Sequence, residues 1–126
     1  MSKIRILPFV AMVSMLATSL ASAESFHFDT MEINVGTIDL TRVDTLLCTF
    51  DFQNQSDSPI WFTQGKVSCE CSTMDYPTDT ILPQQTRTIT TYTATHELEQ
   101  EFARFFMLTD QKGAEYVLVV SGEVSE

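Results

Sequence analysis

Cys69 and Cys71, separated by one residue in the stretch Ser-Cys-Glu-Cys-Ser, are the residues of this 126-residue chain best suited to chemistry. In an extended strand, residues i and i+2 lie about 6.5–7 Å apart at Cα. Disulfides need Cα separations of about 4.4–6.8 Å and converging side chains. A Cys69–Cys71 bond therefore requires a bend, and it would be a candidate for thiol redox chemistry. The negative charge of Glu70 between them disfavours the reactive thiolate form.

A soft-metal site is a second interpretation of the same residues. Thiolates of Cys69 and Cys71, together with the thioether of Met74, are the ligands that suit Cu(I). His27 and His96 are distant in the sequence and could complete a zinc set only if the fold brings them close. Two neighbouring ligands without a second ligand pair are a weak metal signal, so no metal and no cofactor is predicted.

A structural role for the cysteines is the third interpretation, and the pattern favours it. A cysteine often fills an inward position as a small hydrophobic side chain. Cys48 shares a strand face with Phe50 and is expected in the core. Three cysteines allow one disulfide and one free thiol, so a bond from Cys48 to Cys69 or to Cys71 stays open.

No catalytic residues are predicted. His27 stands in an alternating strand and His96 in a polar loop, and neither belongs to a recognisable nucleophile–base set. Trp61, beside Phe62, is the one candidate for contact with a glycan or peptide ligand. Alternation lets only one of the two aromatic rings point inward, and the sequence favours core packing of Trp61.

The first 23 residues have the layout of a secretory signal peptide. A basic start precedes an apolar run over residues 6–20, and Ala21-Ser22-Ala23 offers the small residues that precede cleavage, here before Glu24. The run is too short and too interrupted for a membrane span. We therefore expect one exported domain over residues 24–126, located in the periplasm or outside the cell.

The expected mature domain is strongly acidic. Residues 24–126 hold 5 basic and 17 acidic side chains, a net charge of −12. Such a surface repels phosphate backbones, which argues against nucleic acid as a partner.

The hydrophobic pattern of residues 24–126 has a period of two, which is typical of strands buried on one face. Turn signals separate the strands, among them Asp110-Gln111-Lys112-Gly113, and Thr95 to Gln100 is expected to be a loop with one helical turn. The Thr-rich segment is expected to be only modestly buried. Strands are predicted over residues 26–28, 31–35, 46–53, 60–67, 86–95, 102–109 and 116–120. About seven short strands predict an all-β, immunoglobulin-like antiparallel sandwich.

The chain from residue 26 to residue 124 resembles the bacterial family called domain of unknown function 1573. The motifs that carry the resemblance follow one another at the family's spacing: Val35-Gly36-Thr37-Ile38, Phe50-Asp51-Phe52-Gln53-Asn54, Ser68-Cys69-Glu70-Cys71-Ser72, Leu82-Pro83-Gln84 and Leu118-Val119-Val120-Ser121-Gly122-Glu123-Val124. Glu70 and Gln84 stand where the family usually has Gly, and Cys48 replaces an aliphatic or aromatic residue. The resemblance implies an exported immunoglobulin-like sandwich and no particular activity.

The sequence therefore predicts an exported, non-catalytic module that binds a protein or glycan partner in the cell envelope. A free sheet edge that takes up a partner strand is one way for such a domain to bind. The alternative is an envelope protein that handles thiols or a soft metal such as copper through Cys69 and Cys71. The state of those two sulfurs distinguishes the two hypotheses.

Overall fold

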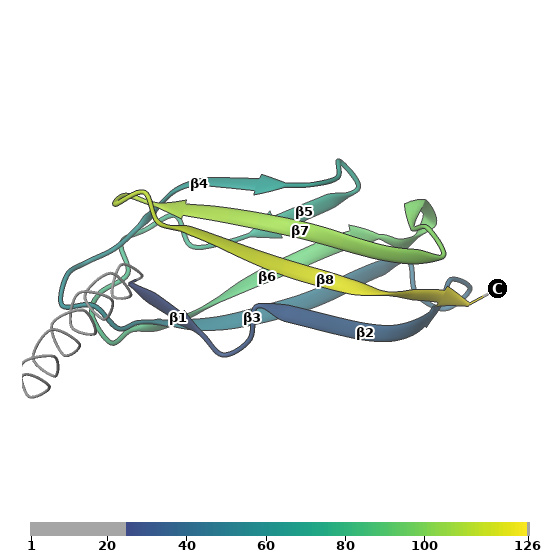
Figure 1. Ribbon diagram of the computed structural model, residues 1–126, viewed down its shortest axis with the longest axis horizontal. Coiled ribbons are helices and arrows are strands. Elements are labelled where there is room, and N and C mark those ends of the chain that lie inside the picture. The colour runs from purple at the N-terminus through teal and green to yellow at the C-terminus, as the bar shows by residue number, and fades with distance from the viewer. Residues whose placement is uncertain (1–24, 126) are drawn as a thin grey trace, which may run out of the picture.

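A computed structural model describes residues 25–125, which form two four-stranded sheets packed face to face (Figure 1). The predicted signal peptide, residues 1–23, lies outside the described residues. No helix within residues 25–125 is both long and apolar enough to cross a membrane. The expected immunoglobulin-like all-β sandwich is confirmed.

The first sheet has the strand order β1-β3-β6-β5, and all of its neighbours are antiparallel. The second sheet has the order β2-β8-β7-β4, in which β2 runs parallel to β8 and the other pairs are antiparallel. The strands of the first sheet are β1 (Phe26–Phe28), β3 (Thr45–Asn54), β6 (Thr86–Ala94) and β5 (Ser72–Asp75). Those of the second are β2 (Glu32–Asp39), β8 (Glu115–Ser125), β7 (Glu101–Asp110) and β4 (Phe62–Val67).

The core forms where the inward faces of the two sheets meet. On β3 the alternating residues Cys48, Phe50 and Phe52 are buried, as the period-two pattern predicted. The run Tyr116–Val120 lies in β8, an inner strand of its sheet. Asp110 ends β7, and the turn that follows closes the predicted hairpin.

Four details differ from the sequence prediction. The first is the parallel pairing of β2 with β8 in a sandwich that was expected to be antiparallel. The Thr-rich strand β6 is an inner strand, and Thr91 and Thr93 are 1% exposed, so the expectation of modest burial was wrong. Their hydroxyls are satisfied inside the protein, because Thr91 Oγ1 donates to the Cys48 carbonyl and Thr93 Oγ1 hydrogen-bonds Ser72 Oγ. The four-residue strand β5 was not predicted. The expected strand start at Ile60 is a single bridge to Ile81, and β4 begins only at Phe62.

Candidate functional site

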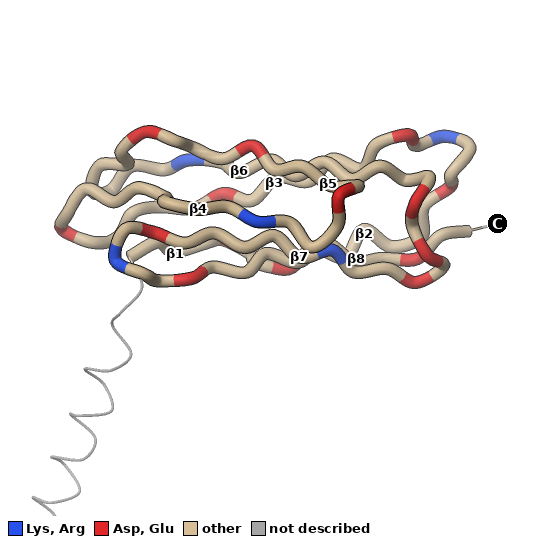
Figure 2. Tube along the Cα trace, turned by 90° about the horizontal axis from the view of Figure 1, so that it is seen from above, with Lys and Arg blue, Asp and Glu red and all other residues tan. Residues whose placement is uncertain are grey.

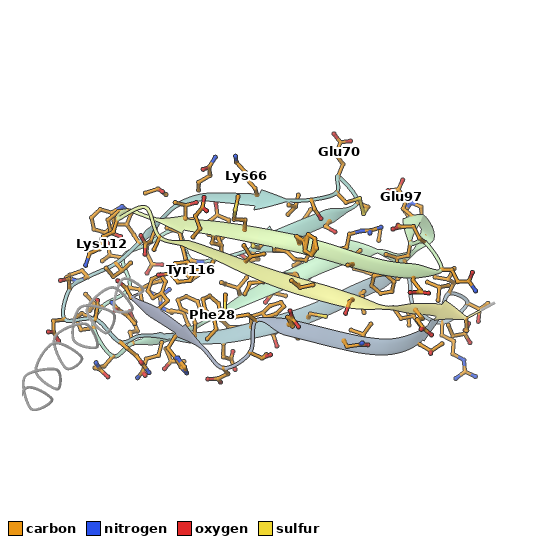
Figure 3. All side chains as sticks on the ribbon, in the orientation of Figure 1. Phe28, Lys66, Glu70, Glu97, Lys112 and Tyr116 are labelled. Carbon is orange, nitrogen blue, oxygen red and sulfur yellow. A yellow bond between two sulfur atoms is a disulfide. The ribbon has the colours of Figure 1, made fainter. Side chains whose placement is uncertain are left out.

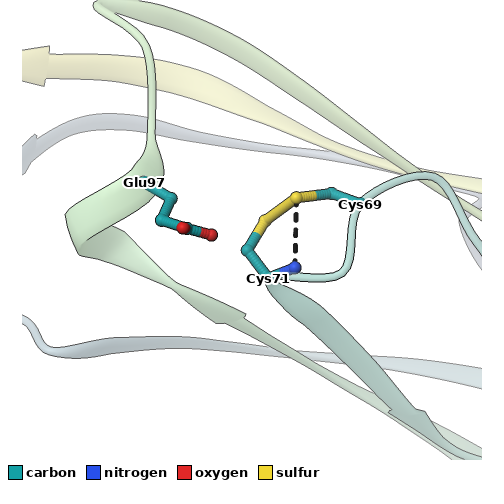
Figure 4. A group of neighbouring side chains, drawn as sticks. All are labelled: Cys69, Cys71 and Glu97. Carbon is teal, nitrogen blue, oxygen red and sulfur yellow. Dashed lines mark hydrogen bonds between the residues drawn. A yellow bond between two sulfur atoms is a disulfide. The ribbon is translucent and has the colours of Figure 1, made fainter.

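Cys69 and Cys71 form a disulfide in the turn between β4 and β5 (Figure 4). Their Cα atoms are 5.1 Å apart, closer than in an extended strand. The turn is closed by a 3.0 Å hydrogen bond from the Ser72 amide to the Cys69 carbonyl. The chain therefore makes the bend that a Cys-x-Cys bond requires.

The carboxylate of Glu97 lies beside this disulfide. One of its oxygens and the sulfurs of Cys69 and Cys71 are all within 4.8 Å of one another. Glu97 belongs to a single 3-10 turn, η2 (Thr95–Glu97), which follows β6. We call Cys69, Cys71 and Glu97 the sulfur–carboxylate cluster.

The register of β5 against β6 brings these distant segments together. Ser72 pairs with Thr93, and the Ala94 amide donates a 2.9 Å hydrogen bond to the Cys71 carbonyl. The chain then enters η2 at once, so its third residue, Glu97, reaches back over the two sulfurs (Figure 4).

Arg104 on β7 hydrogen-bonds the backbone of η2. Its guanidinium is buried, and Nη2 donates to the Glu97 carbonyl at 3.4 Å and to Glu99 Oε1 at 2.7 Å. The hydrogen bond from Arg104 lowers the pKa of Glu99 below its ordinary value. A buried cation thus ties the segment carrying Glu97 to the second sheet.

The other residues that the sequence offered as metal ligands, Met74, His27 and His96, lie outside the sulfur–carboxylate cluster. Met74 on β5 is partly buried and packs against the hydrophobic core. His27 belongs to β1, and Figure 1 shows β1 at the other end of the sandwich from the turn between β4 and β5. His96 is an exposed residue of η2.

Cys48 has no disulfide partner. Its thiol is free and its side chain is 6% exposed, so the alternative of a bond to Cys69 or Cys71 is not what the structure shows. Burial raises the pKa of the Cys48 thiol. The core position predicted from the alternation in β3 is correct.

Trp61 is not part of the core, and this prediction was wrong. The side chain of Trp61 is 42% exposed, whereas Phe62 is buried. Because side chains alternate along a strand, only one of these two neighbouring rings can point inward. Phe62 is the first residue of β4 and takes the inward position, so Trp61 does not. Trp61 is anchored through its backbone, because its amide donates to Gln111 Oε1 and its carbonyl accepts from the Gln111 amide.

A second feature, which sequence reasoning missed, is an apolar groove on the outer face of the second sheet. It has a volume of about 290 Å³. The residues that line it come from β4, β7, β8 and the start of the turn after β4: Lys66, Val67, Ser68, Phe105, Met107 and Val117. Phe105 and Val117 are 47% and 45% exposed. The groove therefore exposes large apolar side chains on an outward sheet face that normally carries polar ones.

Lys66 at this groove is one of the few basic residues without a carboxylate partner. Among residues 25–125, Arg42, Arg87 and Arg104 each pair with an acidic side chain, whereas Lys66 and Lys112 form no ion pair. Acidic positions outnumber basic ones along the trace in Figure 2. A free cation beside an apolar groove is therefore a local exception on an acidic surface.

The family model described as "Protein of unknown function (DUF1573)" matches residues 26–124. The chain belongs to this family. The resemblance seen in the sequence motifs is thereby confirmed, including the stretch that contains the Cys69–Cys71 disulfide. No curated protein matches the chain in sequence.

Solved structures share the fold at low identity. A protein of unknown function from Porphyromonas gingivalis W83 has a TM-score of 0.66 and 10% identity, over 82% of this chain and 50% of its own. PapD-like domain 7 of human CEP192 has a TM-score of 0.60 and 8% identity, over 81% of this chain and 86% of its own. The Escherichia coli chaperone DraB has a TM-score of 0.57 and 13% identity, over 78% of this chain and 54% of its own. This chain thus spans about half the length of the P. gingivalis and DraB chains that it matches.

Proposed function

We propose that this family member is an exported, non-catalytic binding module that takes up an extended segment of a partner protein. The observation that carries the proposal is the apolar groove beside an edge strand. The occupant that fits is a segment with alternating apolar side chains and one acidic residue.

The edge strand supplies the backbone part of such binding. β4 is the last strand of its sheet, so alternate amide and carbonyl groups of Phe62–Val67 point away from β7. An added strand can pair with these groups, and its side chains on one face then reach the outer surface of the sheet. The fold shared with the chaperone DraB supports a role in protein binding.

The groove supplies the side-chain part. Phe105, Met107 and Val117 offer an apolar floor, and covering this exposed apolar surface with a partner side chain favours binding. Lys66 at the same groove favours an acidic residue in the partner. The largely aliphatic lining favours a peptide over a glycan, which stacks on aromatic faces.

The experiment is selection from a library of nine-residue peptides displayed on phage, followed by affinity measurement with the enriched peptides. We expect enriched sequences with apolar residues two positions apart and one Asp or Glu. Phe105→Ser and Lys66→Glu should each weaken binding by about tenfold or more, equivalent to about 1.4 kcal/mol. The matched control is Leu47→Ser, because Leu47 is 57% exposed on β3 in the other sheet. It should leave the affinity unchanged.

Three outcomes would contradict the proposal. The first is a library that enriches no peptide, and the second is a loss of affinity on Leu47→Ser as large as that on Phe105→Ser. The third is a dimer in sedimentation that dissociates on Phe105→Ser, which would show that a second copy of this chain fills the groove. Export is tested separately by the intact mass of the protein in the envelope fraction, which should begin at Glu24.

A further inference from the structure

We propose that the sulfur–carboxylate cluster is a redox-controlled Zn²⁺ site, which is closed while Cys69 and Cys71 are bonded and opens when a dithiol reduces them. The three ligand atoms would be the two sulfurs and one oxygen of Glu97, with water in the fourth position. This site lies at the β4–β5 turn and is separate from the binding function proposed for the apolar groove.

The positions of the three atoms carry the proposal. Both sulfurs and a Glu97 oxygen already lie within 4.8 Å of one another. In a tetrahedral site with Zn–S bonds of about 2.3 Å, neighbouring ligand atoms lie about 3.5–3.8 Å apart. Breaking the disulfide lets the sulfurs separate toward that spacing, while η2 keeps the carboxylate beside them.

The charge around the two sulfurs favours a bound cation. Glu97 and Glu70 are both negative, and Glu70 at the tip of the turn points away from the sandwich (Figure 3). These two negative charges beside the sulfurs favour a bound divalent cation. The mixture of two thiolates and one carboxylate suits Zn²⁺ better than Cu(I), which prefers sulfur alone.

The backbone around the cluster is fixed in advance. The Cys71 carbonyl is held by the Ala94 amide, and the Glu97 carbonyl is held by buried Arg104. These contacts do not involve the sulfurs, so they persist when the disulfide opens. A chelate whose backbone is already fixed loses little conformational entropy when it binds the metal.

The reductive step balances as follows. A dithiol reductant gives two electrons and two protons, its own two sulfurs join in a disulfide, and Cys69 and Cys71 become thiols. The Cys71 amide points at Cys69 Sγ, 3.1 Å away, so it stabilises negative charge on Cys69 as the bond breaks. The reductant's thiolate therefore attacks Cys71 Sγ, and Cys69 leaves. Zinc binding then releases the two thiol protons to solvent.

The experiment is a Co²⁺ titration of the full mature chain, followed by displacement of Co²⁺ with Zn²⁺. Protein reduced with dithiothreitol and desalted under nitrogen should bind one Co²⁺ with the near-ultraviolet thiolate charge-transfer band and the visible bands of a tetrahedral site. Zn²⁺ should abolish both. Unreduced protein should show neither band.

Matched variants separate ligation from general electrostatics. Glu97→Gln should weaken binding by the reduced protein by about tenfold or more. Glu70→Gln removes the same charge from the β4–β5 turn that carries the two cysteines, and it should change the affinity by less than about threefold, since it only weakens a screened field. Cys69→Ser and Cys71→Ser should each lose the charge-transfer band, with circular dichroism reporting the fold. The proposal is overturned by equal binding to reduced and unreduced protein, by absence of the thiolate band, or by equal effects of Glu97→Gln and Glu70→Gln.

Discussion

The hydroxyl of Tyr116 donates a 2.9 Å hydrogen bond to Oδ2 of Asp110, and both side chains are almost completely buried. The other carboxylate oxygen of Asp110 accepts from the amides of Lys112 and Ala114, which shapes the β7–β8 hairpin. The Tyr116 oxygen accepts weaker hydrogen bonds from the amides that precede and begin β1, at 3.3 and 3.4 Å. One buried polar network therefore joins the hairpin of one sheet to the first strand of the other.

Replacing Tyr116 with Phe should destabilise the domain by about 1–3 kcal/mol, because buried Asp110 would lose a hydrogen-bond donor. The measurement is urea unfolding of both proteins at neutral pH. Tyr92→Phe is the control, since the Tyr92 hydroxyl makes no hydrogen bond within residues 25–125, and it should cost little. Equal stabilities of the Tyr116→Phe variant and the wild-type protein would contradict the assigned role of the network.

The same tyrosine should give the domain a distinct alkaline instability. Burial raises the pKa of Tyr116 to about 12, since ionisation in the core is unfavourable. An unfolded tyrosine ionises near pH 10, so between about pH 10 and 12 the unfolded state has lost its proton while the folded state keeps it. The stability that the buried, protonated Tyr116 contributes is fully present below about pH 10 and is lost as the pH rises from about 10 to 12. Wild-type stability should therefore fall more steeply there than that of Tyr116→Phe; parallel curves would count against a raised pKa.

Gln84→Gly should stabilise the protein. Gln84 is the only non-glycine residue in the described part of the chain with a positive φ, at 69°. This left-handed conformation costs a residue with a Cβ roughly 1 kcal/mol, which glycine avoids. Glycine also has more conformational freedom in the unfolded chain, which offsets part of this gain. The free energy of unfolding should therefore rise by a few tenths of a kcal/mol to about 1 kcal/mol, measured by thermal or urea unfolding.

Gln85→Gly is the control for this substitution. Gln85 accepts a hydrogen bond from the Leu82 amide through Oε1, and its φ is not positive, so glycine should destabilise the domain there. The interpretation fails if both substitutions shift stability in the same direction.

Thiol counting should find one hidden cysteine and one disulfide. Burial and the raised pKa of the Cys48 thiol make it unreactive toward iodoacetamide in the folded protein. We expect no adduct on native protein, one adduct after unfolding without reduction, and three after unfolding with reduction, read by intact mass. Three adducts without reduction would mean that Cys69 and Cys71 are not bonded.

The architecture was predictable from residue pattern, because each strand face repeats every second residue. Phe50 and Phe52 on β3 mark the inner face without knowledge of their partners. Burial of β6 was not predictable in the same way, because threonine is ambiguous. Burial of Thr91 and Thr93 depends on partners for their hydroxyls. The Cys48 carbonyl accepts a hydrogen bond from Thr91, and Ser72 Oγ is hydrogen-bonded to Thr93 Oγ1.

The candidate sites were only partly predictable. The two cysteines stand out in the sequence, but Glu97 joins them through the register of β5 against β6, and β5 itself carries little hydrophobic signal. The apolar groove was missed for a different reason. Continuous apolar runs in β7 and β8 indicate strands buried on both faces, whereas the face bearing Phe105 and Val117 is exposed.

Removing the carboxylate of Glu99 should destabilise the domain at neutral pH and not in acid. Arg104 is buried and Glu99 is its ion-pair partner, so Glu99→Gln leaves a buried cation without its counter-charge. The pKa of Glu99 is lowered by the hydrogen bond from Arg104, so the ion pair stabilises the fold above the ordinary glutamate pKa. The stability that this ion pair contributes is lost as the pH falls through the lowered pKa of Glu99. Urea unfolding from pH 7 to pH 3 should show the difference between the wild-type protein and Glu99→Gln shrinking toward zero.

The control for Glu99 is Glu101→Gln, because Glu101 is exposed and forms no ion pair within residues 25–125. It removes the same charge from the same end of β7 and should change stability little at any pH. Arg104→Met combined with Glu99→Gln should recover part of the loss, since it also removes the uncompensated buried charge and the buried Nε that lacks a hydrogen-bond partner. If Glu99→Gln and Glu101→Gln behave alike, Arg104 is stabilised mainly by the carbonyls of Glu97 and Ala103. The anchoring of η2 would then depend on backbone contacts and not on the ion pair.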